Sequence, residues 1–308
     1  MRRNRFCAGC SGSCEQFDLT ESVPILEDGT GFDRLLGFTL PDRHARGRAV
    51  RLGPVLEEIL SAHSYPPAVK GLLAEALVLT ALLGGLLKDH GSQLTMQAQA
   101  EGGIVSLLVC DYREGQVRGY AQFDAERLAR LGSNPSLGAL FGANKTGARL
   151  AITFDLAATG QRYQGIVPLE GASLAEACES YFIQSEQVPT LIRLGVHADG
   201  EEGRERLHAR MDHPEWEHVA ILAGSTRHDE LVDPTLSLEE IVWRLFHEER
   251  EVRVEKGAHL RRGCRCSVEH YERVLARFPE DELAEMRDDA GKILVDCAFC
   301  SRLFEINL

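Results

Sequence analysis

Several signatures of enzymes are missing from this sequence. It contains no G-x-x-x-x-G-K-[ST] phosphate loop, no G-x-S-x-G nucleophile turn and no H-E-x-x-H helix. These absences argue against the commonest nucleotide-dependent and hydrolytic enzymes. We therefore expect a protein that is not an enzyme, and the missing phosphate loop fits one that works without ATP.

Signals for export and membrane insertion are also weak. The basic N-terminus, Met1 to Cys7, is not followed by the continuous apolar stretch of a secretory signal. The most apolar segment, 68–87, contains Glu75 and has Gly84-Gly85 near its end. A membrane span needs about 20 apolar residues with few charges, so this segment is expected to be a buried core helix. We expect a cytoplasmic protein with no membrane partner.

Positive charge is in deficit, with 34 Lys and Arg against 47 Asp and Glu and a net charge of −13. A negative surface repels phosphate backbones, so nucleic acid is not an expected partner. Two short basic stretches, 43–48 and 253–262, could act locally against this average. The first has a simple interpretation as a solvated edge.

The fold class indicated is α+β, with a mixed core domain at residues 32–203 after a flexible, Cys-containing extension at 1–31. Gly53-Pro54 predicts the start of one helix, and the apolar segment 68–87 predicts a second, longer helix. Segments 94–100, 104–110, 117–123 and 149–154 have the pattern of strands. Ser173 and Glu176 predict a capping box that opens a helix over 173–184.

Residues 204–262 have a different composition, richer in charge and histidine. Ser237 and Glu240 form a second predicted capping box, which opens an amphipathic helix. Short helices are marginal in water without a partner surface. We interpret this stretch as a metastable helical linker that needs to pack on another part of the chain.

The residues that carry chemistry are cysteines. Of the nine in the chain, Cys110 and Cys178 stand alone among apolar neighbours and are expected to be buried. Four others form a C-x-C and a C-x-x-C pair within 263–308: Cys264, Cys266, Cys297 and Cys300. The second pair lies between two apolar segments that predict short strands, and Ser267 is placed to begin a helix after the first. Four thiolates suit a closed tetrahedral Zn²⁺ site, so we predict one Zn²⁺ per chain.

Two interpretations of this zinc site remain open on the residues alone. The simpler is a structural site that folds about fifty residues with too few apolar side chains of their own. The more specific interpretation is a redox switch. Each pair brings two sulfurs close enough to oxidise to a disulfide, and zinc holds the sulfurs as thiolates, which are the reactive form. A structural zinc-ribbon binding module would favour basic and aromatic surroundings, whereas the insert carries Glu280-Asp281-Glu282. His213 and His218 lie near acids, but Pro214 disfavours a regular helix through them and so argues against a metal site there.

The chain also resembles the 33-kDa redox-regulated heat-shock chaperone (33 kDa chaperonin) family over roughly residues 32–306. The resemblance rests on the C-x-C…C-x-x-C pattern together with 117–120, 163–169, 181–190 and 244–249. It implies an ATP-independent holdase that is zinc-bound and inactive when reduced. By the same resemblance, oxidation joins Cys264 to Cys266 and Cys297 to Cys300, zinc leaves and the linker unfolds. The active protein is then a homodimer that binds unfolding client proteins under oxidative stress.

A group of three cysteines, Cys7, Cys10 and Cys14, departs from the family pattern. Three thiols cannot close a four-sulfur site. An exposed, oxidisable tail is the favoured interpretation, and a second metal site is the alternative.

Overall fold

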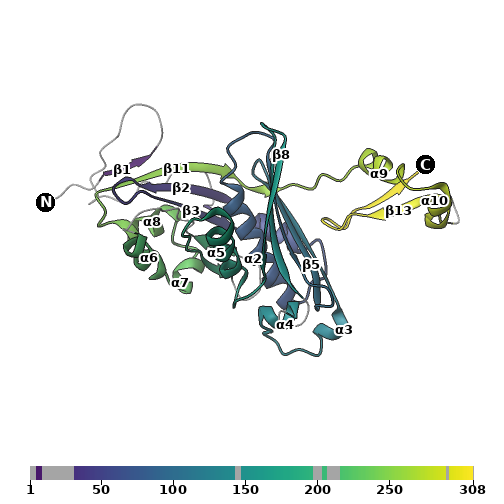
Figure 1. Cartoon of the computed structure of the whole chain (residues 1–308), viewed down its shortest axis with the longest axis horizontal. Coiled ribbons are helices and arrows are strands. Elements are labelled where there is room, and N and C mark those ends of the chain that lie inside the picture. Colours follow the sequence, from purple (N-terminus) through teal and green to yellow (C-terminus); the bar gives the residue numbers. More distant parts are fainter. Residues whose placement is uncertain are drawn as a thin grey trace.

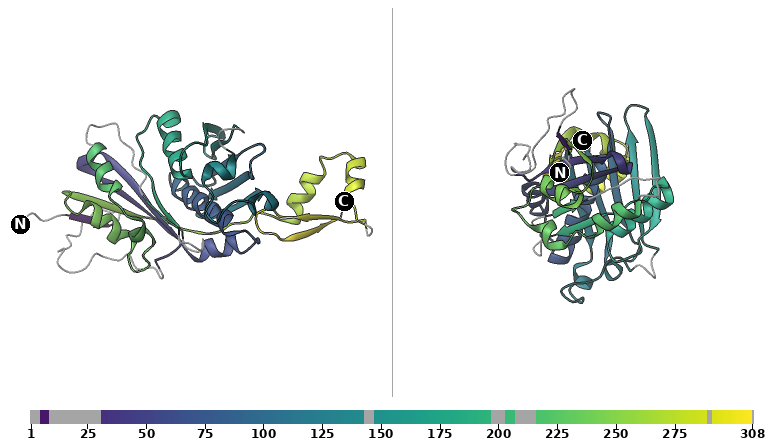
Figure 2. Two further views of the ribbon diagram at one scale, coloured as in Figure 1. Left: turned by 90° about the horizontal axis from the view of Figure 1, so that it is seen from below. Right: turned by 90° about the vertical axis from the view of Figure 1, so that its left-hand side faces the viewer.

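The computed structural model describes residues 5–8, 31–142, 147–196, 203–206, 216–288 and 291–307. For residues 5–8, 203–206 and 216–217 it describes the backbone alone. The molecule is elongated (Figures 1 and 2). One six-stranded sheet lies at the N-terminal end, a second lies in the middle, and a small C-terminal unit extends from the second sheet.

The first sheet has the strand order β1-β11-β2-β3-β10-β9. Its strands are β1 (Arg5–Ala8), β2 (Arg34–Leu40), β3 (Ala45–Leu52), β9 (Arg193–Val196), β10 (Gly203–Arg206) and β11 (Glu251–His259). The short helix η1 (Pro41–Arg43) and His44, at φ 49°, turn β2 into β3. Strand β11 pairs with β2 in antiparallel fashion although more than 200 residues separate them in the chain. A long-range pairing thus ties 251–259 to the core.

The second sheet has the order β12-β6-β5-β4-β7-β8. Its strands are β4 (Gln93–Gln99), β5 (Val105–Arg113), β6 (Gln116–Phe123), β7 (Arg149–Leu156), β8 (Gln161–Pro168) and β12 (Arg261–Arg262). Most of its neighbours pair antiparallel, but β12 adds to β6 in parallel. As a result, the edge strand beside β6 comes from the segment that leads into the first cysteine pair.

Helix α2 (Pro67–Gly84) lies in the core and packs against strands of both sheets. Its length and mean hydropathy of 1.5 would suffice for a membrane span, but 72% of that stretch is buried within the protein. At its end the backbone passes close to β5, because a Cβ on Gly84 would lie 2.1 Å from the Tyr112 ring. The prediction of a core helix is confirmed.

Shorter helices complete the core domain. They are α1 (Pro54–Leu60), α3 (Ala125–Leu128), α4 (Leu137–Phe141), α5 (Leu174–Tyr181) and the π-helical turn η2 (Phe182–Glu186). Ser173 caps α5 by accepting from the Glu176 N–H at 3.3 Å. The Glu176 carboxylate accepts from Ala172 N rather than from the cap residue. Only half of the predicted capping box therefore forms.

The three linker helices cover one face of the first sheet: α6 (Trp216–Gly224), α7 (His228–Val232) and α8 (Leu238–Phe246). Both halves of the predicted Ser237–Glu240 capping box are present in α8. Helix and strand side chains share one apolar cluster: Leu36, Phe38, Leu40, Ala45, Ala49, Val219, Ala223, Leu238, Val242, Phe246, Val252 and Val254. The linker range thus contains the expected helices, but it also contains β11, which the sequence pattern did not predict.

The C-terminal unit contains α9 (Val268–Leu275), α10 (Glu280–Met286) and the hairpin of β13 (Ile293–Asp296) and β14 (Leu303–Ile306). Ser267 caps α9 by accepting from His270 N at 3.2 Å, as predicted. The fully buried side chains of this unit are few: Leu275, Leu283, Ile293, Cys297, Phe304 and Ile306. So small a core is typical of units that need a metal or disulfides to stay folded.

Candidate metal centre

Two short turns carry the four cysteines of the C-terminal unit. Cys264 and Cys266 lie between β12 and the capped start of α9, and Cys297 and Cys300 lie in the turn that joins β13 to β14. The second turn is closed by hydrogen bonds from Cys300 N and Ser301 N to Cys297 O, at 3.2 and 2.8 Å. Secondary structure on both sides therefore directs sulfurs from separate segments to one place.

The four Sγ atoms lie within 4.8 Å of one another. The Sγ atoms of Cys264 and Cys266 are 3.2 Å apart, and 3.5 Å separates Cys264 from Cys297 and Cys266 from Cys300. A disulfide would need about 2.05 Å, so these are four free thiols.

The donor set and its spacing fit zinc. Zn–S bonds of about 2.3 Å in a tetrahedron place sulfurs about 3.8 Å apart, close to the separations found here. Sulfur ligands favour Zn²⁺ over hard cations such as Mg²⁺ or Ca²⁺. The cluster could hold one metal ion.

The thiols differ in acidity. Burial raises the pKa of Cys297, but hydrogen bonds from the Tyr271 hydroxyl and from the N–H groups of Phe299 and Cys300 outweigh this and lower it to about 6. Burial, followed by hydrogen bonding to neighbouring thiols, raises the pKa of Cys266, and burial raises that of Cys300. Negative charge in the cluster is therefore concentrated on Cys297.

Three of the four cysteines are partly exposed and border a cavity. A cavity of about 340 Å³ is lined by Cys264, Cys266 and Cys300 together with Glu58, Arg262 and Arg302. Cys297 is only 3% exposed. A small oxidant entering this cavity would meet the C-x-C pair and Cys300 before it met Cys297.

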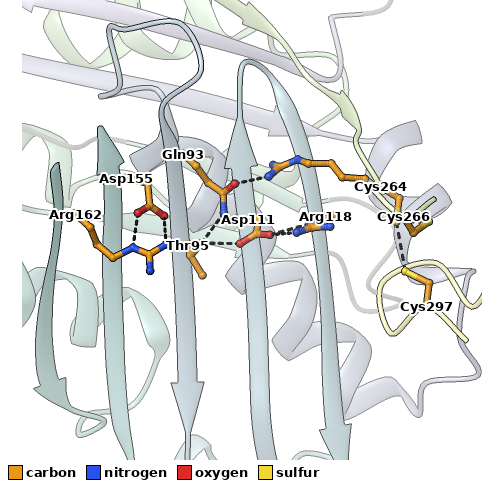
Figure 3. A network of polar contacts seen from close by, with 10 residues as sticks. Gln93, Thr95, Asp111, Arg118, Asp155, Arg162, Cys264, Cys266 and Cys297 are labelled. Carbon is orange, nitrogen blue, oxygen red and sulfur yellow. Dashed lines mark hydrogen bonds and ion pairs between the residues drawn. The ribbon is translucent and has the colours of Figure 1, made fainter. Parts of the chain in front are cut away.

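Side chains next to the cysteines connect the cluster to the second sheet (Figure 3). The Arg265 guanidinium, from between the first two cysteines, donates to Gln93 Oε1 on β4. Gln93 in turn bonds to Thr95 at 3.0 Å. The sequence pattern identified the cysteines but gave no sign that Arg265 contacts a strand 172 residues away.

Comparison with known proteins decides the family. The family described as Hsp33 protein matches residues 33–307. The chain belongs to the Hsp33 family. It is 38% identical over 306 residues to the 33 kDa chaperonin of Caulobacter vibrioides, covering 94% of this chain and 99% of that one. It is 33% identical to the 33 kDa chaperonin of Shigella boydii over 285 residues, covering 89% of this chain and 92% of that one.

The Hsp33 fold is shared as well. The crystal structure of the 33 kDa chaperonin from Thermotoga maritima superposes with a TM-score of 0.71 at 23% identity, over 89% of this chain and 94% of that chain. The resemblance noted from the sequence is confirmed, and so is the mixed α/β fold class. Hsp33 proteins are a family of stress-response chaperones.

Other cysteines and histidines do not join the cluster in the described part of this Hsp33 chain. Cys110 and Cys178 are fully buried, as predicted. Cys7 lies on β1 with its backbone beside Arg253, whereas Cys10, Cys14 and the other residues of 1–4 and 9–30 in the predicted extension fall outside the described residues. His218 bonds to Glu249 at 3.1 Å, and His213 is not among the described residues.

The basic stretch 43–48 is divided between two faces of the first sheet. Arg43 forms an ion pair with Glu249 at 2.8 Å. Arg46 and Arg48 line a cavity of about 350 Å³ that also includes Lys88 and Glu186. Arg48 donates to Gly85 O, and burial together with the neighbouring Arg46 lowers its pKa. This stretch is thus partly structural, not simply a solvated edge.

Proposed function

We propose that this chain is a redox-regulated, ATP-independent holdase, kept inactive by a zinc-bound cluster of Cys264, Cys266, Cys297 and Cys300. The observation that carries the proposal is the convergence of four free thiols within 4.8 Å at the end of the segment that continues from the linker. Membership of a chaperone family supports the activity.

Bound Zn²⁺ would hold the four sulfurs as thiolates and fix their positions. The chain supplies these positions itself through the α9 cap and the β13–β14 turn. Since Cys297 belongs to the small buried core and the other three pack against it, the fold of the unit and the state of its sulfurs are coupled.

Oxidation is the proposed activating step. Two cysteine thiolates give two electrons to one peroxide molecule, which takes up two protons from solvent, so that one S–S bond and two molecules of water form. By family resemblance the pairs are Cys264–Cys266 and Cys297–Cys300. The first pair is the closest measured, at 3.2 Å, and it borders the cavity through which an oxidant enters. Thiol–disulfide exchange would restore the reduced state.

Loss of the C-terminal fold would then release the linker. We assign residues 32–203 to the core domain, 204–262 to the linker and 263–308 to the switch domain. The linker covers apolar side chains of β2 and β3, including Leu36, Phe38 and Leu40. Exposure of such a face would let the protein bind unfolding clients and form a homodimer. We place this activity in the cytoplasm, where such thiols stay reduced at rest.

A structural zinc ribbon without redox switching is the alternative. It explains the small C-terminal core equally well. The cavity beside three of the sulfurs favours the switch, because an inert structural site gains nothing from access to oxidants.

Aggregation of an unfolding client protein tests the proposal. Light scattering would be followed with the reduced protein and after peroxide at mildly raised temperature, with zinc release recorded by a chelating dye. We expect suppression only after oxidation, in step with zinc release. Cys178→Ala, which removes a thiol outside the cluster, should behave as the parent does. Zinc release without suppression would reject the holdase switch.

A further inference from the structure

Strand β6 holds the start of the C-terminal unit through the short edge strand β12. Arg261 and Arg262 of β12 lie opposite Gln116 and Val117 of β6. Arg261 N donates to Gly115 O at 2.8 Å, and Gly263 N donates to Val117 O at 2.9 Å. The backbone that leaves β11 is thus bonded along β6 up to the residue before the first cysteine.

The same strand receives an aromatic side chain from the other cysteine pair. Phe299, between Cys297 and Cys300, meets Tyr120 edge to face with ring centroids 4.8 Å apart. The guanidinium carbon of Arg118 lies 3.9 Å from the centre of the Phe299 ring. Arg118 and Tyr120 are two residues apart on β6, so both project from one face of the sheet.

Arg118 is held in position for this contact. Its Nε and Nη2 bond to Asp111 Oδ2 at 2.8 and 2.6 Å, and Asp111 also accepts from the Thr95 hydroxyl at 2.7 Å (Figure 3). Asp111 is 3% exposed, so the ion pair is shielded from solvent on that side. A fixed guanidinium over an aromatic face loses little entropy on contact, so this cation–π pair is favourable.

We infer that Phe299, Arg118 and Tyr120 form a latch, the Phe299 latch, that transmits the state of the cysteine cluster to the linker. The inference rests on the proposed redox function. A disulfide between Cys297 and Cys300 brings their sulfurs to about 2.05 Å and reshapes the turn that carries the Phe299 ring. Withdrawal of the ring leaves β12 attached to β6 by few backbone hydrogen bonds.

Release of β12 would act directly on the rest of the linker, because β12 is the last part of the linker range and follows β11 in the chain. Leu260 N donates to Asp33 O at 2.7 Å, and β11 ends at His259, so 259–263 is one continuous bonded segment. The turn before β6 lies against it, because a Cβ on Gly115 would be 2.4 Å from His259 O. Loss of order at β12 therefore frees the end of β11, the linker strand whose Val252 and Val254 share an apolar cluster with α6 and α8.

Amide hydrogen exchange in the zinc-loaded, reduced full chain tests the latch. Phe299→Ala should raise the exchange rate of the Arg261 and Gly263 amides about tenfold, equivalent to about 1.4 kcal/mol, with zinc content unchanged. Phe299→Tyr, which keeps an aromatic face, should restore protection. Phe278→Ala removes a 39% exposed aromatic of the same unit and should have no effect on these amides.

If Phe299→Ala loses metal, a second variant tests the same contact from the core domain. Arg118→Gln leaves the C-terminal unit unaltered and should produce the same faster exchange at Arg261 and Gly263. It should also lower the peroxide dose needed for activation. Unchanged exchange in Arg118→Gln would overturn the latch, whatever the client assay shows. If exchange is faster in Arg118→Gln but the protein never suppresses aggregation, the latch is supported and the holdase function is rejected.

Discussion

Arg34 on β2 and Glu239 on α8 form an ion pair of 2.5 Å although their side chains are only 7% and 0% exposed. The second carboxylate oxygen of Glu239 has no hydrogen-bond partner among the described residues. Burial of a charge with incomplete hydrogen bonding is costly, so this pair specifies where α8 packs without adding much stability. Such a contact suits a linker that, in the proposed function, unfolds on activation.

Glu239→Gln should loosen the linker without oxidant. Removal of one charge leaves the Arg34 guanidinium buried and unpaired, with an expected cost of about 3 kcal/mol. Limited proteolysis of the reduced protein should show faster cleavage within 216–250. Glu248→Gln, at an exposed position on the same segment, serves as the control. Equal cleavage rates in the two variants would mean that the buried pair does not hold α8.

Loss of the α8 cap should act in the same direction but more weakly. Ser237→Ala removes the acceptor for Glu240 N, bonded at 3.1 Å, and should destabilise α8 by about 1 kcal/mol. The peroxide dose for half-maximal activation should fall. Ser136→Ala removes a cap of the same kind from α4 in the core domain. If both variants shift the dose equally, the effect is not specific to the linker.

Glu75 should make core stability depend on pH. Burial raises its pKa to about 7, although the N–H groups of Ala175 and Leu174 at the start of α5 partly oppose this. A carboxyl with a raised folded-state pKa favours the folded state most below its unfolded pKa of 4.5, and that advantage is lost as pH rises through about 7. Urea unfolding at a series of pH values should show a loss of about 3 kcal/mol from this group over this range.

Glu75→Gln should flatten that pH profile. The amide keeps an oxygen for Ala175 N, now 3.2 Å from Glu75 Oε1, but it has no proton to release. Glu57→Gln on α1 changes an exposed carboxyl and should leave the slope of the parent. A slope in Glu75→Gln equal to that of the parent would assign the pH dependence to other groups.

The sequence predicts best where one side of an element is buried and the other is wet. Strands β4 and β6 and helix α8 meet this condition, and their patterns were interpreted correctly. Strand β2 does not, because Leu35 faces the main core while Leu36 and Phe38 face the linker. An element buried on both faces shows no period of two, so β2 was not predicted.

The sequence also predicted only part of the site: the cysteines themselves, but not the contacts that connect them to the core domain. Cysteine spacing alone identifies the four thiols, and the structure brings them together. Phe299 and Arg265 were missed because their partners, Arg118 and Gln93, lie some 170–180 residues earlier in the chain. No local pattern encodes a contact of that kind.

The most direct test of the redox switch follows zinc, thiols and linker together in a single sample. Zinc release, free-thiol content and hydrogen exchange of residues 216–262 would be recorded while the reduced protein is oxidised with peroxide. One zinc per chain should leave as four thiols are lost, and linker protection should fall at the same rate. Zinc and thiols lost with the linker still fully protected would contradict a switch that acts through the linker.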